Sequence, residues 1–163
     1  MLGTNLKWEM NSIKTLTIDK AIMMEEIRTL ISEGKTVSLT VKGHSMSPFI
    51  VHLRDQLTLG PFKDEDVKPR AVALVRDIHG NHLIHRIIKR KGNKVLLQGD
   101  GNVGLQEVAE ISDVIALVYS IERKGHSYSV FPKPCLIWRI YSCIWLWLTP
   151  LRRYLLAIWR RLR

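Results

Sequence analysis

The sequence predicts a mainly β protein, with a folded sheet or partial barrel in the middle of the chain and a helix-forming segment at each end. The middle of the chain carries many short strand-like runs at close spacing, with turn residues and little helix between them. The segments before and after it carry apolar residues at helical spacing instead. The 163 residues are enough for one domain with its own hydrophobic core.

The first expected element is a helix that starts near Thr17 and runs to about Ser32. Its apolar residues recur at helical spacing, and Gly34 follows as a natural C-terminal stop. Residues 1–20 lack the apolar core of a signal peptide, so no export signal is expected there. Strands are then expected over residues 36–41, 56–59, 71–76, 83–89, 95–98, 108–111 and 114–119, followed by a hairpin over Lys124-Gly125.

The positive charge of the chain is concentrated in its tail. The formal net charge is +10 and the isoelectric point is about 9.9. Residues 135–163 hold six arginines and no acidic residue, so the rest of the chain carries 19 basic and 15 acidic side chains. This distribution disfavours a uniformly basic nucleic-acid-binding domain, and we expect no nucleic-acid partner. Cys135 and Cys143, both in the tail, form no metal-binding pattern and indicate a disulfide only weakly.

Residues 134–163 predict an amphipathic helical tail. A nearly all-apolar run broken by Arg139 extends to Leu148, and Pro150 interrupts it. Beyond Pro150, apolar residues recur at helical spacing with arginines on the other face. A basic, tryptophan-rich segment of this kind is typical of a helix in the membrane interface, here on the cytoplasmic leaflet. The alternatives are packing of the tail on a partner or on its own domain, and a tilted insertion of its first half.

The most informative stretch of the chain is Gly43-His44-Ser45-Met46-Ser47-Pro48, which lies between a strand-like run and a helix-like run. Gly43 allows a backbone angle that other residues resist, Ser45 can cap a following helical turn, and Pro48 suits the first turn of a helix. Such a junction presents the serine outward beside free backbone N–H groups, which can receive a negative charge. An ordinary helix N-cap is the alternative.

Two further residues extend this pattern downstream. His85 lies in an otherwise apolar strand, and alternation places it on the same face as Leu83 and Ile87. Burial keeps an imidazole neutral near pH 7, as a general base requires. Asp100, between two glycines, would orient that imidazole and stabilise its protonated form, as in triad chemistry. The alternatives are a hydrogen-bonded core histidine and an ordinary aspartate turn.

His79, His82 and His85 are spaced by three, a pattern that raises the question of a metal site. On a strand, however, His82 and His85 point to opposite faces. The hairpin turn is also expected to include His79 and His82. We therefore expect neither a metal nor another cofactor.

Five segments occur in an order that is characteristic as a set: Gly43-His44-Ser45-Met46-Ser47-Pro48, Arg54-Asp55-Gln56-Leu57, Ala71-Val72-Ala73-Leu74-Val75, His85-Arg86-Ile87 and Gln98-Gly99-Asp100-Gly101-Asn102. They resemble the signal peptidase I superfamily, to which LexA-like serine peptidases also belong. The resemblance covers roughly residues 36–120 and is greatest to the Ser-His branch, the archaeal, endoplasmic-reticulum and sporulating-bacterial type.

The resemblance implies a signal peptidase/LexA-like folded β-sheet domain over residues 36–131, between an N-terminal helical segment, 1–35, and the tail, 132–163. It implies that Ser45 is the nucleophile, that His85 is the base in place of the lysine of the bacterial branch, and that Asp100 is the motif aspartate. The activity implied is that of a serine endopeptidase acting on a precursor or exported peptide at a membrane. The alternative is a catalytically inactive relative that binds peptides by strand addition or has a regulatory role.

The chain departs from the family pattern at four points. The Gly-Asp after the nucleophile helix is Arg54-Asp55 here, and the second Gly-Asp is Arg70-Ala71. A further acid is expected shortly after the Asp100 motif, and Gln106 and Glu107 stand near its place. The N-terminal membrane anchor that is usual in the family is not expected in this sequence.

Overall fold

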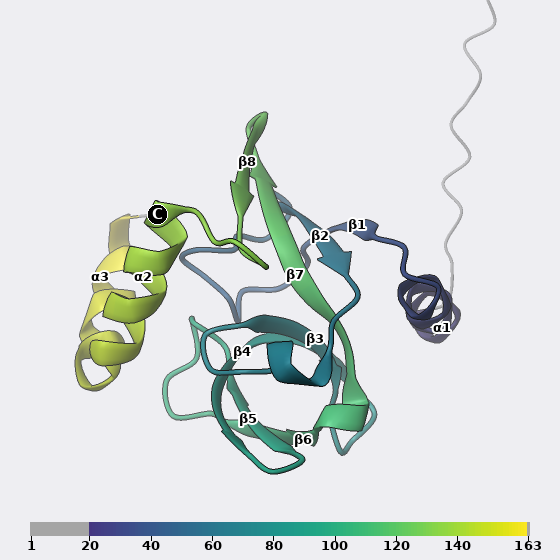
Figure 1. The fold of residues 1–163 in the computed structure, drawn as a ribbon. Coiled ribbons are helices and arrows are strands. Elements are labelled where there is room, and N and C mark those ends of the chain that lie inside the picture. The colour runs from purple at the N-terminus through teal and green to yellow at the C-terminus, as the bar shows by residue number, and fades with distance from the viewer. Residues whose placement is uncertain (1–19, 163) are drawn as a thin grey trace, which may run out of the picture.

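The computed structural model describes residues 20–162, and its centre is one antiparallel sheet of eight strands that curls into a half-barrel (Figure 1). The strand order is β1-β2-β7-β3-β4-β5-β6, and β8 pairs with β7 as a projecting hairpin. The predicted mainly β class is therefore confirmed. The strands are β1 (Val37–Thr40), β2 (Gln56–Gly60), β3 (Val72–Arg76), β4 (His82–Lys91), β5 (Lys94–Gln98), β6 (Glu107–Glu110), β7 (Val114–Arg123) and β8 (His126–Ser129).

Strand β3 and the first half of β7 are buried on both faces, and this explains their nearly continuous apolar sequences. One hydrophobic core contains Leu74 of β3 together with residues of the N-terminal and C-terminal helices. The other contains Ala73 of the same strand together with apolar residues of β4 to β7. Neighbouring residues of one strand therefore belong to different cores.

Helix α1 (Lys20–Ser32) covers the first core with Met24, Ile27 and Ile31. The helix ends at Ser32, and Gly34 follows with a φ of 81°, which lets the Lys35 N–H donate to the Leu30 carbonyl at 3.0 Å. The predicted glycine stop is thus confirmed. The predicted helix start near Thr17, and the expectation about an export signal, lie outside the described residues.

The predicted hairpin over Lys124-Gly125 is also confirmed. These two residues have φ values of 48° and 78°, and they connect β7 to β8. Positive φ at both central residues is typical of the mirror-image turns whose twist matches that of paired strands. The Lys-Gly pair therefore sets the register of the projecting hairpin.

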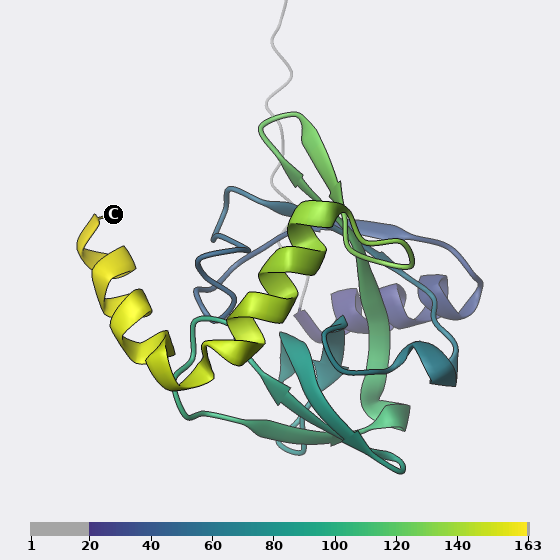
Figure 2. The same cartoon turned by 60° about the vertical axis from the view of Figure 1, so that its left-hand side comes forward.

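The C-terminal segment forms helix α2 (Leu136–Trp147), a short 3-10 turn η3 (Thr149–Leu151) and helix α3 (Arg152–Leu162), with the break at Pro150 as predicted. Figure 2 shows α2 lying against the half-barrel and α3 continuing away from it. The inner face of α2 buries Trp138, Tyr141 and Trp145 in the first core. Packing on its own domain, one of the alternatives for the tail, is thus found for this face. No helix within residues 20–162 combines the length and apolarity that crossing a bilayer requires.

Arg70, just before β3, adopts a left-handed backbone conformation with a φ of 81°. Such a conformation costs an L-residue about 1–2 kcal/mol, part of which glycine avoids. We expect Arg70→Gly to raise the free energy of unfolding by about 0.5–1 kcal/mol, since the exposed side chain is not part of a core and the added chain entropy offsets some of the gain. Urea unfolding checks this, with Lys68→Gly as the control that lacks a positive φ and is expected to lose stability. A less stable Arg70→Gly protein would contradict the prediction.

Candidate active site

Ser45 lies half-buried in residues 43–50, here called the serine turn, within the segment that joins β1 to β2. The helix-like run expected after the serine is not a helix, because this segment consists of turns. Two bonds of helical spacing remain in the segment, from the Ile50 N–H to the Met46 carbonyl at 3.0 Å and from the Asp55 N–H to the Val51 carbonyl at 3.2 Å. Met46 and Ile50 both enter the first core. The apolar residues whose spacing predicted a helix therefore anchor an irregular turn in the core.

Asp55 holds the far end of this segment. Its carboxylate accepts hydrogen bonds from the Val51 N–H at 2.8 Å, from Arg54 at 2.8 and 3.0 Å and from Arg123 at 3.0 and 2.9 Å. Arg123 also donates to the Phe49 carbonyl of the serine turn. Burial alone would raise the pKa of Asp55, but the hydrogen bonds from Arg54, Arg123 and Val51 lower it from 3.8 to about 2. The aspartate of the Arg54-Asp55 motif is therefore a structural clamp on the serine turn.

This clamp predicts a specific acid sensitivity. Because the folded-state pKa of Asp55 is lowered, its stabilisation is complete above the unfolded-state pKa near 4 and is lost as the pH falls towards 2. The difference corresponds to about 2 kcal/mol. We expect Asp55→Asn to lower the free energy of unfolding by about that amount at pH 7 and to flatten its pH dependence between 4 and 2. Glu65→Gln, which changes an exposed carboxylate, is the control, and an unchanged acid limb in Asp55→Asn would contradict this role.

His85 is buried in β4 and pairs with an acid that the sequence did not assign to the site. Its Nδ1 lies 3.0 Å from Oε2 of Glu107 in β6, and the His85 side chain is only 4% exposed. The strand register explains the meeting, because Ile87, Leu97 and Glu107 stand opposite one another across β4, β5 and β6. His85 precedes Ile87 by two residues and so shares its face. A carboxylate at Nδ1 fixes the imidazole tautomer and leaves Nε2 free to accept a proton.

The loop after β5 brings the serine turn and the His85 ring together. A Cβ placed on Gly99 would lie 3.0 Å from His85 Nε2 and 2.4 Å from the Ser45 carbonyl oxygen. A Cβ on Gly101 would lie 2.7 Å from the His44 carbonyl oxygen. The N–H of Gly101 donates to the Ser45 carbonyl at 2.7 Å. Both glycines are therefore required by the close approach of two backbones. Among the described residues, no hydrogen bond joins Ser45 Oγ to His85. In serine peptidases, the hydrogen bond between nucleophile and base often forms with good geometry only when substrate is bound.

The structure corrects the prediction that Asp100 orients His85. Both oxygens of Asp100 accept from Arg86, at 2.9 and 2.7 Å, and Tyr141 Oη donates to the same carboxylate at 2.8 Å. The reason is the alternation of β4, which points His85 and its neighbour Arg86 to opposite faces of the sheet. Asp100 lies on the Arg86 face, and Glu107 lies on the His85 face.

The pair of Arg86 and Asp100 connects the site to helix α2. Arg86 Nη1 donates to Ser142 Oγ at 3.0 Å, and its guanidinium lies 5.0 Å from the Trp138 ring centroid. Burial alone would lower the pKa of Arg86, but the charge of Asp100 raises it above its ordinary value. Burial, and then the charge of Asp100, raise the pKa of Tyr141, so its hydroxyl stays protonated and donates. The ion pair is therefore a permanent structural element of the site.

Two groups of the serine turn could stabilise negative charge. Within the described residues, the Ser45 N–H has no hydrogen-bond acceptor. The Ser47 hydroxyl is buried and likewise has no partner there. An unpaired N–H beside a nucleophile is the arrangement found in oxyanion holes, and a buried hydroxyl can add a second donor.

Other features of the surface lie apart from these residues. A hollow of about 510 Å³ between α2 and residues 66–71 and 130–134 is not lined by Ser45, His85 or Glu107. Within residues 20–162, no three side chains among His, Cys, Asp and Glu gather as a metal ion would require. No family model, curated protein or solved structure matches this chain.

Proposed function

We propose that this protein is a serine endopeptidase of the Ser-His type, with the signal peptidase/LexA-like fold and chemistry that the sequence motifs indicate. The observation that carries the proposal is the meeting of the Ser45 backbone and the buried His85 ring at Gly99, with Glu107 on the far side of that ring. A nucleophile, a base and a carboxylate that orients the base form the working unit of serine peptidases. The substrate class is an extended segment of a precursor or exported protein.

The proposed reaction is acyl transfer to Ser45. Ser45 Oγ forms a bond to the carbonyl carbon of the scissile peptide while its proton passes to His85 Nε2. The C–N bond then breaks, and His85 returns the proton to the leaving amine. Water attacks the resulting ester with His85 as base, which releases the acid product and restores the serine. The Ser45 N–H and the Ser47 hydroxyl face the oxyanion in both steps.

The sheet edge supports an extended substrate. β1 lies at one end of the strand order and leads directly into the serine turn. Ser38, a residue of this strand, is exposed. A peptide that adds to this edge as a further strand would run towards Ser45. The same edge would serve the alternative function, an inactive module that binds extended peptides without cutting them.

Cleavage of a mixture of extended peptides, followed by mass spectrometry, separates the two functions. We expect cleavage by the wild type, none by Ser45→Ala or His85→Ala, and unchanged cleavage by Ser127→Ala, which alters an exposed serine on β8. Binding of an uncleaved peptide should persist in Ser45→Ala, because the edge strand is intact. Peptide binding without any cleavage by the wild type would reject the peptidase and support the binding module.

A further inference from the structure

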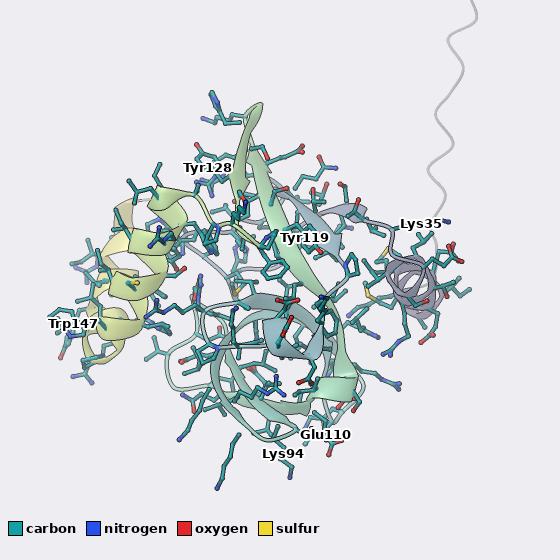
Figure 3. All side chains as sticks on the ribbon, viewed as in Figure 1. Lys35, Lys94, Glu110, Tyr119, Tyr128 and Trp147 are labelled. Atoms are coloured by element: carbon teal, nitrogen blue, oxygen red, sulfur yellow. The ribbon has the colours of Figure 1, made fainter. Side chains whose placement is uncertain are left out.

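The outer faces of α2 and α3 carry apolar side chains that the domain does not cover. On α2, Ile137 and Ile140 are 69% and 51% exposed, Ile144 is 49% exposed, and Trp147 is 81% exposed. Figure 3 shows Trp147 at the outer edge of the helix, projecting away from the sheet. Consecutive exposed residues at helical spacing form one stripe rather than scattered apolar positions.

Helix α3 extends this stripe. Tyr154 and Ile158 are 54% and 56% exposed, and they are four residues apart on one face. The side chains that α3 turns inward include Arg152, which is buried and donates to the Trp145 carbonyl at 3.2 Å. Leu156 is the only apolar residue of α3 in the first core, among the side chains described there. The predicted division into an arginine face and an apolar face is therefore found only in part, because Arg152 is buried whereas Arg153 and Arg161 are exposed like Tyr154 and Ile158.

The exposed stripe is not an incomplete packing surface of the domain. α2 already buries its aromatic face, on which Tyr141 donates to Asp100 and Trp138 lies against Arg86. The outer face is therefore additional to the face that holds the helix in place. Monomeric soluble proteins rarely leave a continuous apolar surface of this kind uncovered, so it needs an occupant.

The charge around the stripe identifies the occupant. The tail from residue 135 to 163 contains six arginines and no acid, and Arg139, Arg153 and Arg161 are exposed. A second copy would bring like charges together, whereas an anionic bilayer attracts them. The helices have 12 and 11 residues, and such short amphipathic helices with tryptophan at the boundary suit the headgroup region of a membrane.

We propose that the outer faces of α2 and α3 bind the surface of an anionic lipid bilayer, with Trp147 and the isoleucines of α2 inserted between the headgroups. The arginines of the tail then contact the lipid phosphates. The aromatic inner face of α2 keeps its contacts with Asp100 and Arg86, so the helix joins the bilayer to the domain. This inference is independent of the proposed peptidase activity.

Flotation of the purified full chain with vesicles tests this inference. We expect binding to vesicles of phosphatidylcholine with phosphatidylglycerol, weaker binding to phosphatidylcholine alone, and loss of binding at high salt. Ile140→Glu/Ile144→Glu should lower the partition coefficient more than about tenfold, since each loses apolar contact with the acyl boundary. Ile22→Glu/Ile78→Glu is the matched control, because those isoleucines are 65% and 80% exposed but lie outside the tail. The control is expected to bind as the wild type does.

A second readout reports insertion directly. In a chain with Trp8→Phe and Trp159→Phe, Trp147 fluorescence should be quenched by brominated lipid, and a further Trp147→Phe should lose most of that quenching, because the remaining Trp138 and Trp145 are buried in the domain. Circular dichroism confirms that each variant is folded. The inference is overturned if the wild type does not bind the anionic vesicles, or if the control pair weakens binding as much as the tail pair. It is also overturned if the tail pair dissociates a dimer while lipid binding is absent, which would make a second copy the occupant.

Discussion

Asp100→Asn is expected to lower the free energy of unfolding by about 3–5 kcal/mol, which is a large part of the stability of a typical domain. Asp100 and Arg86 are both fully buried, and two hydrogen bonds join them. An asparagine cannot balance the guanidinium charge, so the variant leaves an uncompensated cation in the interior. It also weakens the bond from Tyr141, which helps to hold α2 on the sheet. Urea unfolding with fluorescence detection measures the loss.

A double-mutant cycle separates this pairing from a general intolerance of the position. Replacing both partners, Arg86→Met with Asp100→Leu, removes the charges together and is expected to be less damaging than the sum of the two single changes. Arg86→Lys is the milder variant if the others do not fold, because lysine keeps the charge but loses the bidentate hydrogen bonding to Asp100. A loss below about 1 kcal/mol in Asp100→Asn would show that the pair does not stabilise the fold as described.

Glu107→Gln is expected to slow acylation of Ser45 by about 100- to 10,000-fold while leaving the fold intact. Glu107 accepts from His85 Nδ1 at 3.0 Å and is itself partly exposed, so its side chain contributes little to the cores. A glutamine amide can present its N–H₂ to the ring and favour the tautomer that carries the proton on Nε2, which cannot act as a base. Stopped-flow or gel-based kinetics with a serine-directed probe measure the rate.

Glu110→Gln is the matched control for Glu107→Gln, because it changes an exposed glutamate at the other end of the same strand. It is expected to react at the wild-type rate. Asp100→Asn, measured on its folded fraction, is expected to stay within about tenfold of the wild type, since Asp100 does not touch His85. If Asp100→Asn were inactive and Glu107→Gln fully active, Asp100 and not Glu107 would be the acid that orients His85.

The sequence was sufficient for most of the sheet because its strands and turns carry local signals. Turn residues at 124–125 and 91–93 mark hairpins, and the strands between them alternate or are wholly apolar. The serine turn is the exception. Met46 and Ile50 are four residues apart, as in a helix, but both are fixed by burial in the core rather than by a helical backbone. Tertiary packing decides such a segment, and local pattern does not.

The sequence predicts the strand or loop in which each candidate residue of the site lies. It does not predict which of these side chains contact one another. Ser45 and His85 were identified in the sequence, and the structure brings their backbone and ring to one glycine. The choice between Asp100 and Glu107 depends on which face of β4 each acid meets, and this follows only from the cross-strand register. The contact of Tyr141 with Asp100 joins residues 41 positions apart, and no local pattern encodes it.

The proposed peptidase requires that His85, oriented by Glu107, activates Ser45 as a nucleophile. Labelling of the purified protein with a fluorophosphonate, followed by mass mapping of the adduct, measures this activation. We expect one adduct on Ser45, no adduct in Ser45→Ala, and an adduct in His85→Ala that forms far more slowly. An adduct that formed on Ser45 at the same rate in His85→Ala, or an adduct confined to another serine, would rule out activation of Ser45 by His85.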